Sequence, residues 1–121
     1  MRNMSFSMTT EAVRRREKTV TRRLGWWNLK PGDVLQAVEK AQGLKKGEHV
    51  KPICLIRVVS VHRQMLGDLW RRTPADGREE IAREGFPGQT VGEFIAFFEG
   101  ANRVTASTYV NRIEFEYVDE R

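Results

Sequence analysis

The sequence predicts an α+β domain, and three patterns support this assignment. An apolar run rich in valine, isoleucine and leucine covers residues 53–61 and is typical of a central strand. Residues 109–118 alternate apolar and polar side chains, as a half-buried strand does. Between these segments, residues 91–98 carry apolar side chains at helical spacing. The order of a strand, a helix, several strands, helices and a final strand therefore favours an α+β domain.

The first half of the chain predicts short elements separated by turns. Residues 4–8 alternate as a half-buried strand does, and a short helix is expected over residues 10–17. The sequence Lys-Pro-Gly-Asp at residues 30–33 is a strong turn signal. Residues 34–38 then have the composition of a second strand.

The second half predicts helices bounded by recognisable capping residues. A helical turn is expected over residues 65–70, after the central strand. Asp76 is expected to cap the next helix, which should end at Gly85. A second capping box begins at Thr90, and Gly100 is expected to stop the helix that follows it.

Length and composition indicate one globular domain. The chain has 121 residues, enough for a single hydrophobic core, so we expect one domain over residues 1–121. Apolar residues make up 40% and charged residues 31% of the chain, as in ordinary globular proteins. No apolar run reaches the length of a membrane span, and the N-terminus lacks the apolar segment of a signal peptide. A cytoplasmic location without membrane contact is therefore expected.

The sequence argues against a disulfide and against a structural metal site. Its one cysteine, Cys54, lies in an apolar run, which favours a buried and inert thiol. The two histidines, His49 and His62, are too few to complete a zinc site with it. We therefore expect neither a metal ion nor another cofactor.

The net charge of +5 is concentrated near the N-terminus. Residues 1–30 hold eight lysines and arginines against two acids, whereas the other residues hold thirteen against fourteen. A local basic field of this kind suggests a partner that carries phosphate. Arginine dominates the field, and its planar guanidinium can bind phosphate oxygens or stack on a base.

The block Lys18–Arg23 is the strongest candidate for a functional site, because it combines an amine, two hydroxyls and two guanidinium groups. In a regular strand Lys18 and Thr21 would point to opposite faces, whereas in a helical turn they would lie side by side. Beside other cations and partly desolvated, Lys18 would have a lowered pKa and could accept the proton of the Thr21 hydroxyl. The alternative is a solvated basic turn whose threonines only pair in a sheet.

Two tryptophans and one glutamate are further candidates. Trp26 and Trp27 follow the arginine pair and can stack on nucleobases, or they can pack into or over the core. Glu84 is expected to be the last residue of a helix, where its carboxylate faces the negative end of the helix dipole. This unfavourable position indicates either a functional role or an exposed, frayed helix end.

Four blocks of the sequence together resemble the ASCH domain family, whose members are small relatives of the PUA domain. In order along nearly the whole chain, the blocks are residues 18–23, 30–35, 84–86 and 113–117. The signature of that family is glycine, any residue, lysine, four further residues and arginine. Lys18 and Arg23 match it, and Arg16 stands at the place of the glycine. The resemblance implies a PUA-like β-barrel of about five to six mixed strands with flanking helices.

The resemblance implies an RNA- or nucleotide-binding cleft. Lys18, Thr21, Arg23 and Glu84 would line this cleft. The nucleic-acid-binding residues would be the basic and aromatic side chains around the signature, namely Arg14, Arg15, Arg22, Arg23, Trp26 and Trp27. A non-catalytic accessory domain that binds a partner protein is a further alternative.

The resemblance also implies a catalytic alternative. A small bacterial branch of the ASCH family hydrolyses the acetyl amide of acetylated cytidine, which would make this chain a metal-independent amidohydrolase acting on a modified nucleoside. By that resemblance Thr21 would be the nucleophile and Lys18 its base, and Glu84 would orient the substrate or protonate the leaving amine. Other ASCH proteins are proposed to cleave RNA, so a ribonuclease is another alternative.

Overall fold

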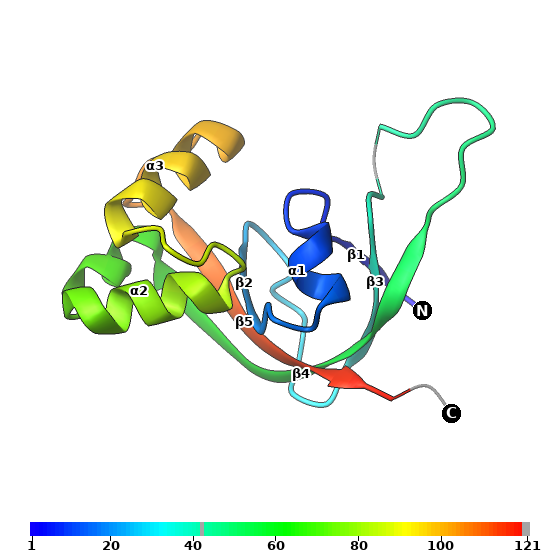
Figure 1. Cartoon of the computed structure of the whole chain (residues 1–121), viewed down its shortest axis with the longest axis horizontal. Coiled ribbons are helices and arrows are strands. Elements are labelled where there is room, and N and C mark those ends of the chain that lie inside the picture. Colours follow the sequence, from blue (N-terminus) through cyan, green and yellow to red (C-terminus); the bar gives the residue numbers. More distant parts are fainter. Residues whose placement is uncertain (42, 120–121) are drawn as a thin grey trace.

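The computed structural model describes residues 1–41 and 43–119, which form one mixed sheet of five strands with flanking helices (Figure 1). In chain order the elements are β1 (Asn3–Ser5), α1 (Thr10–Arg14), β2 (Val20–Arg23), β3 (Val34–Val38), β4 (Pro52–Met65), the 3₁₀ helix η1 (Leu66–Arg71), α2 (Pro74–Arg83), α3 (Val91–Asn102) and β5 (Tyr109–Val118). The strands lie side by side in the order β1-β3-β4-β5-β2. The pairing of β1 with β3 is parallel, and the other three pairings are antiparallel. The predicted α+β class is confirmed.

The sheet is strongly curved but is not closed into a barrel, in contrast to the expected PUA-like barrel. β1 and β2 are its two edges, and within the described part of the chain no strand pairing joins them. β1 has three residues and β2 has four, so neither edge offers much backbone for closing a ladder. One side chain bridges the opening instead, since Arg23 of β2 donates to the backbone carbonyl of Ser5 in β1 at 2.6 Å.

The two faces of the sheet carry separate hydrophobic cores. α1 lies in the concavity of the sheet, whereas α2 and α3 lie together beyond β2 and β5 (Figure 1). The concave core is formed by ten buried side chains, namely Met4, Phe6, Val13, Leu29, Leu35, Ala37, Ile56, Val58, Ile113 and Phe115. A second core lies under α2 and α3 and consists of the buried side chains of Leu66, Leu69, Ile81, Phe94, Ile95, Phe98 and Val110. Cys54 is half-buried and packs against the concave core.

Several predicted element boundaries are confirmed, and two helix ends differ from expectation. The strands at residues 34–38 and 109–118 and the capping box at Thr90 are as predicted. Asp76 does not cap α2: the Thr73 hydroxyl does, accepting from the backbone N–H of Asp76 at 3.2 Å, because Pro74 is well suited to the first helical position. Gly100 does not stop α3, since a glycine inside a helix costs only about 1 kcal/mol and the helix continues to Asn102.

None of the helices among the described residues is both long enough and apolar enough to span a membrane.

Candidate functional site

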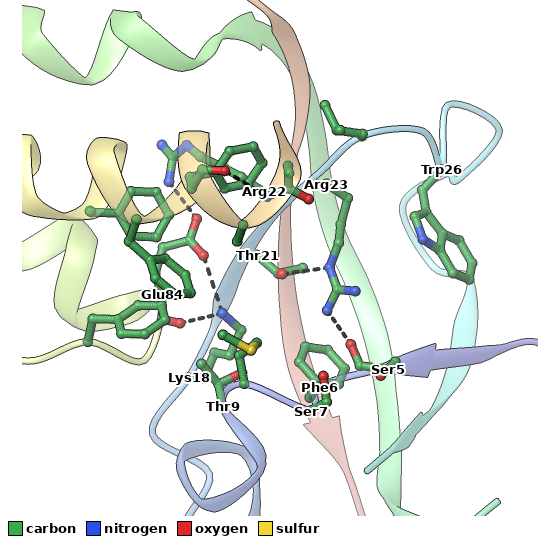
Figure 2. A pocket seen from close by; sticks show the side chains of 18 residues that line it. Ser5, Phe6, Ser7, Thr9, Lys18, Thr21, Arg22, Arg23, Trp26 and Glu84 are labelled. Carbon is green, nitrogen blue, oxygen red and sulfur yellow. Dashed lines mark hydrogen bonds and ion pairs between the residues drawn. The ribbon is translucent and has the colours of Figure 1, made fainter. Parts of the chain in front are cut away.

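A cavity of about 490 Å³ lies along the edge strand β2. Its walls come from the segment after β1, from β2 with the lysine that precedes it, and from α3 with the end of α2 (Figure 2). The volume is within the range of pockets that hold small ligands, about 300–1,000 Å³. Among the side chains that line it are Phe6, Thr21, Arg23, Trp26, Phe97 and Phe98. The cavity therefore occupies the opening that an unclosed barrel leaves between its edge strands.

The alternation of β2 decides which of its side chains enter the cavity. Thr21 pairs across the sheet with Ile113, a residue of the concave core, so Thr21 and Arg23 share that face. The Arg22 side chain points to the opposite face, together with its cross-strand partner Arg112, although Arg22 is also among the residues that line the cavity. That face is covered by α2, and the Arg22 side chain is fully buried there.

Lys18 and Glu84 form a buried ion pair at one end of the cavity. The Lys18 amine donates to Glu84 Oε1 at 3.2 Å and also to the backbone carbonyl of Glu84 (Figure 2). Lys18 precedes β2 in an irregular segment, whose position is set by backbone hydrogen bonds from Lys18 N to Ala12 O and from Thr19 N to Arg83 O. The side-chain alternation of a strand therefore does not apply to Lys18.

The chain reversal after Glu84 depends on Gly85. This residue has φ +102°, which favours glycine, and a Cβ there would lie 3.1 Å from Thr9 Cγ2 and 3.3 Å from Ala12 Cβ. The close approach brings the end of α2 onto α1 and so places Glu84 against Lys18. Glu84 is 2% exposed, so it is not at an exposed, frayed helix end.

A network of buried charges offsets the unfavourable position of Glu84 at the end of α2. Arg22 donates to Glu84 Oε2 at 2.9 Å and to Glu80 Oε2 at 2.7 Å. Glu80 also accepts two hydrogen bonds from Arg112, at 2.6 and 3.0 Å. Two cations, Lys18 and Arg22, thus share the Glu84 carboxylate, and their attraction opposes the helix dipole.

The environment shifts the pKa of several groups in and beside the cavity. Burial lowers the pKa of the Lys18 amine to about 8, although the Glu84 carboxylate acts in the opposite direction. Burial likewise lowers the pKa of Arg23 to about 10. Burial alone would raise the pKa of Glu80, but Arg112 and Arg22 outweigh it and lower that pKa to about 2. Lys18 is therefore a cavity group whose protonation changes close to neutral pH.

Lys18, Thr21 and Glu84 all line the cavity, but the hydrogen bonds divide them into two pairs. Thr21 Oγ1 accepts from Arg23 Nε at 2.9 Å, whereas Lys18 is bonded to Glu84. Among the hydrogen bonds of the described residues, none joins Lys18 to Thr21. The three residues thus line one cavity, and Lys18 and Thr21 are not hydrogen-bonded to each other.

The remaining predicted residues are spread over different environments. Trp26 is half-buried and lines the cavity, whereas Trp27 is 50% exposed and lies outside it. Arg14 and Arg15 are exposed on or beside α1 and form ion pairs with Glu39 and Glu17, respectively.

The structure places Arg22 differently from the surface position expected of a nucleic-acid-binding residue. Its side chain is wholly buried, because its guanidinium is engaged by Glu80, Glu84 and Gln64. Arg22 is therefore placed to hold the Glu84 carboxylate in position through their ion pair.

Sequence reasoning did not single out the aromatic wall of the cavity. Phe97 and Phe98 of α3 line the cavity together with Lys18 and Thr21. Phe98 belongs to the apolar stripe predicted for residues 91–98, and Phe97 lies one position beside that stripe. The sequence signal for this wall was Phe97 itself, because an aromatic residue beside the apolar stripe widens the apolar face of the helix towards a second surface.

Arg16, at the place of the signature glycine, has a left-handed backbone conformation. Arg16 has φ 59°, in the left-handed region that glycine adopts readily and other residues rarely. Its guanidinium donates to Asp119 at 3.1 Å and lies 5.5 Å from the centre of the Tyr117 ring. The turn into the Lys18 segment therefore has, at the place of the signature glycine, a backbone conformation that glycine adopts readily.

The comparisons agree with this geometry at the level of the fold. No family model and no curated protein match the sequence. Two solved structures are similar to the fold of this chain. One is a protein from Enterococcus faecalis V583 of the family DUF984, with a TM-score of 0.63 and 16% identity over 98% of this chain and 77% of that chain. The other is an ASCH domain from Lactobacillus crispatus JV V101, with a TM-score of 0.54 and 18% identity over 95% and 77%.

The chain has an ASCH-like fold. At this level of identity the likeness establishes the fold and not the ligand. Within the ASCH-like fold, the block Lys18–Arg23 enters the edge strand β2, and the block Glu84–Phe86 closes the same cavity from α2. Two of the four sequence blocks that resemble the family therefore meet at one cavity.

Proposed function

We propose that the cavity beside β2 binds one nucleoside or nucleotide unit, either free or as part of an RNA strand. The observation that carries this proposal is the mixed lining of the cavity. The hydrogen-bonding side chains of Lys18, Thr21 and Arg23 line it together with the rings of Phe97 and Phe98. A nucleobase has matching chemistry, with polar edges and flat apolar faces.

Arg23 is the residue best suited to fix such a ligand. Its guanidinium lies 4.8 Å from the centre of the Phe6 ring, and it donates to Thr21 and to the backbone of Ser5. Among the described residues, these contacts hold the group in one orientation and engage two of its nitrogens, Nε and Nη2. The remaining N–H groups are available for a phosphate oxygen or a base edge. The resemblance to ASCH domains, which implied RNA or nucleotide binding, supports the same proposal.

Calorimetric titration with cytidine monophosphate and with a short mixed-sequence RNA tests the proposal. Arg23→Gln is expected to weaken binding of both ligands by about 10- to 100-fold, because hydrogen bonds to a charged group contribute about 1.5–3 kcal/mol. Arg78→Gln is the matched control, since Arg78 is exposed on α2 and does not line the cavity. Equal affinities of the Arg23→Gln variant and the wild type would contradict the proposal, provided that circular dichroism shows both to be folded.

A second candidate function, hydrolysis of an acylated nucleoside, is favoured by one observation. Lys18 has a lowered pKa and shares its cavity with Thr21 and Glu84. In this reaction Thr21 Oγ1 bonds to the acyl carbon as its proton passes to neutral Lys18. The C–N bond then breaks, the amine leaves with that proton, and water hydrolyses the resulting ester. Arg23 already donates to Thr21 Oγ1 and would stabilise negative charge on that oxygen.

Incubation with acetylated cytidine, followed by chromatography of the products, tests this second candidate. Thr21→Ala and Lys18→Met are both expected to abolish turnover. Thr19→Ala is the matched control, because its hydroxyl accepts from Arg83 and does not line the cavity. Turnover that persists in Thr21→Ala or Lys18→Met would refute the assigned roles. The rate is expected to rise with pH up to about 8, as Lys18 loses its proton.

A further inference from the structure

Arg63 on β4 stacks on two aromatic side chains at the surface, Trp27 and Tyr109. Its Cζ lies 4.8 Å from the centre of the Tyr109 ring and 5.4 Å from that of the Trp27 ring. Trp27 is 50% and Tyr109 51% exposed, and Arg63 itself is exposed. Over residues 1–41 and 43–119, no ion pair joins Arg63 to an acidic residue. The stack thus presents a fixed positive charge to solvent.

This arrangement differs from that of other exposed arginines of the chain. Arg2, Arg14, Arg15 and Arg57 are all paired with carboxylates. Stacking on an aromatic ring uses a flat face of the guanidinium and leaves its N–H edge uncovered. That edge matches the oxygens of a phosphate, and the rings have already restricted the rotamers of the side chain.

The stack is continuous with the cavity through a row of residues across the sheet. Asn111 of β5 pairs with Arg63 of β4 on one side and with Arg23 of β2 on the other. Residues directly opposite in neighbouring strands point to the same face, so Arg23 and Arg63 share a face at a spacing of about 10 Å. The Asn111 side chain donates to the backbone carbonyl of Trp26 at 2.9 Å. It thereby fixes the loop in which Trp26 lines the cavity and Trp27 stacks on Arg63.

We propose that Trp27, Arg63 and Tyr109 form a second nucleotide subsite, which binds the neighbour of the nucleotide held in the cavity. Arg63 binds the phosphate of that nucleotide, and an exposed ring stacks on its base. The ligand is then a single-stranded RNA segment that runs from Arg23 to Arg63, and not a free nucleoside. The identity of the ligand rests on the proposed function of the cavity, whereas the subsite itself is tested separately.

Fluorescence anisotropy with a labelled single-stranded RNA, combined with calorimetry of cytidine monophosphate, tests the second subsite. Arg63→Gln and Trp27→Ala are each expected to weaken RNA binding by about tenfold. Arg63→Gln should also reduce the slope of log affinity against log salt by about 0.7, the value for one phosphate contact on a single strand. Both variants should bind cytidine monophosphate as the wild type does, because neither residue lines the cavity.

Arg57→Gln is the matched control, because Arg57 is exposed on the same strand and pairs with Glu116 at 3.4 Å. It removes the same charge and should leave RNA affinity unchanged.

Equal RNA affinity and an equal salt slope in Arg63→Gln and the wild type would overturn the proposal. Wild-type protein that binds no RNA, or that binds duplex RNA as tightly as single-stranded RNA, would also overturn it. If Arg63→Gln weakens RNA binding and Arg23→Gln affects neither ligand, the cavity proposal fails and the second subsite stands.

Discussion

Lys18 and Glu84 lie 66 positions apart in the chain, yet the amine of one donates to the carboxylate of the other at 3.2 Å in the protein interior. Both side chains are almost completely buried. Arg22 holds the second oxygen of the same carboxylate. One carboxylate therefore compensates two buried cations, one in the cavity wall and one under α2. This arrangement makes Glu84 a structural as well as a chemical component of the site.

Replacing Glu84 by glutamine is expected to destabilise the fold by about 3 kcal/mol or more. The change leaves Lys18 and Arg22 with less compensation in a buried environment, and breaking a buried pair typically costs about 3–5 kcal/mol. Urea unfolding at neutral pH measures this effect. Glu116→Gln is the control, because its pair with Arg57 is exposed and should contribute less than about 1 kcal/mol. Similar losses in the two variants would contradict this account of Glu84.

The lowered pKa of Lys18 predicts that stability rises with pH above about 8. Burial lowers the pKa from 10.5 in the unfolded chain to about 8 in the folded protein. Between these values the unfolded state binds more protons than the folded state, so the free energy of unfolding increases with pH. The burial cost is fully present below pH 8 and is relieved as the pH approaches 10.5. The full shift corresponds to about 3 kcal/mol.

Urea unfolding at several pH values between 8 and 10 measures this dependence, below the pH at which tyrosines ionise. Lys18→Met, which cannot titrate, should lose most of the rise, and the part that remains near pH 10 is expected from Arg23, whose pKa burial lowers to about 10. Lys30→Met is the control, because Lys30 is exposed, and it should keep the wild-type profile. The same rise in wild type and Lys18→Met would assign the effect to another group.

The sequence predicted the residues of the cavity better than it predicted their surroundings. From the sequence, Lys18 and Thr21 could lie on the same surface only if their segment formed a helical turn and not a strand. In the structure both line the cavity although neither geometry joins them. Lys18 lies before β2 in a segment bonded to Ala12, and strand alternation does not apply to it. No local pattern encodes that contact, since it arises from the packing of α1 against the end of α2.

Arg22 and Arg23 show why neighbouring residues of one type could not be distinguished from sequence. Strand alternation places them on opposite faces, but the buried face is decided by α2, whose Glu80 lies 58 positions after Arg22. The prediction of a closed barrel was wrong for a related reason. The lengths of the edge strands β1 and β2 depend on tertiary pairing and not on local propensity.

Glu80 is expected to make the fold sensitive to acid. Arg112 and Arg22 outweigh burial and lower its pKa from 4.5 to about 2 in the folded protein. Its stabilising contribution is therefore present above pH 4.5 and is lost as the pH falls towards 2. Glu80→Gln should lower stability by about 3 kcal/mol at neutral pH and flatten the dependence between pH 4.5 and 2. Chemical unfolding across this pH range measures both effects. Glu79→Gln is the control, because Glu79 is the exposed residue next to Glu80. A wild-type acid profile in Glu80→Gln would be inconsistent with this role.

Two glycines in the helices beside the cavity are expected to respond oppositely to the same substitution. A Cβ at Gly77 in α2 would lie 2.5 Å from Val91 Cγ2, at the start of α3, whereas a Cβ at Gly100 in α3 would meet nothing within 4 Å. Gly100→Ala should therefore stabilise the protein by about 0.5–1 kcal/mol through helix propensity. At Gly77 the same gain is opposed by an overpacking cost of about 1–3 kcal/mol, so Gly77→Ala should destabilise.

Urea unfolding of the two variants and of the double variant Gly77→Ala/Val91→Ala checks this prediction. The double variant should recover stability relative to Gly77→Ala, because removal of the valine methyl groups makes room for the new Cβ. Equal stabilisation by Gly77→Ala and Gly100→Ala would show that α2 and α3 are not in tight contact. Since α3 carries Phe97 and Phe98 of the cavity wall, a shift of this helix should also weaken cytidine monophosphate binding in Gly77→Ala but not in Gly100→Ala.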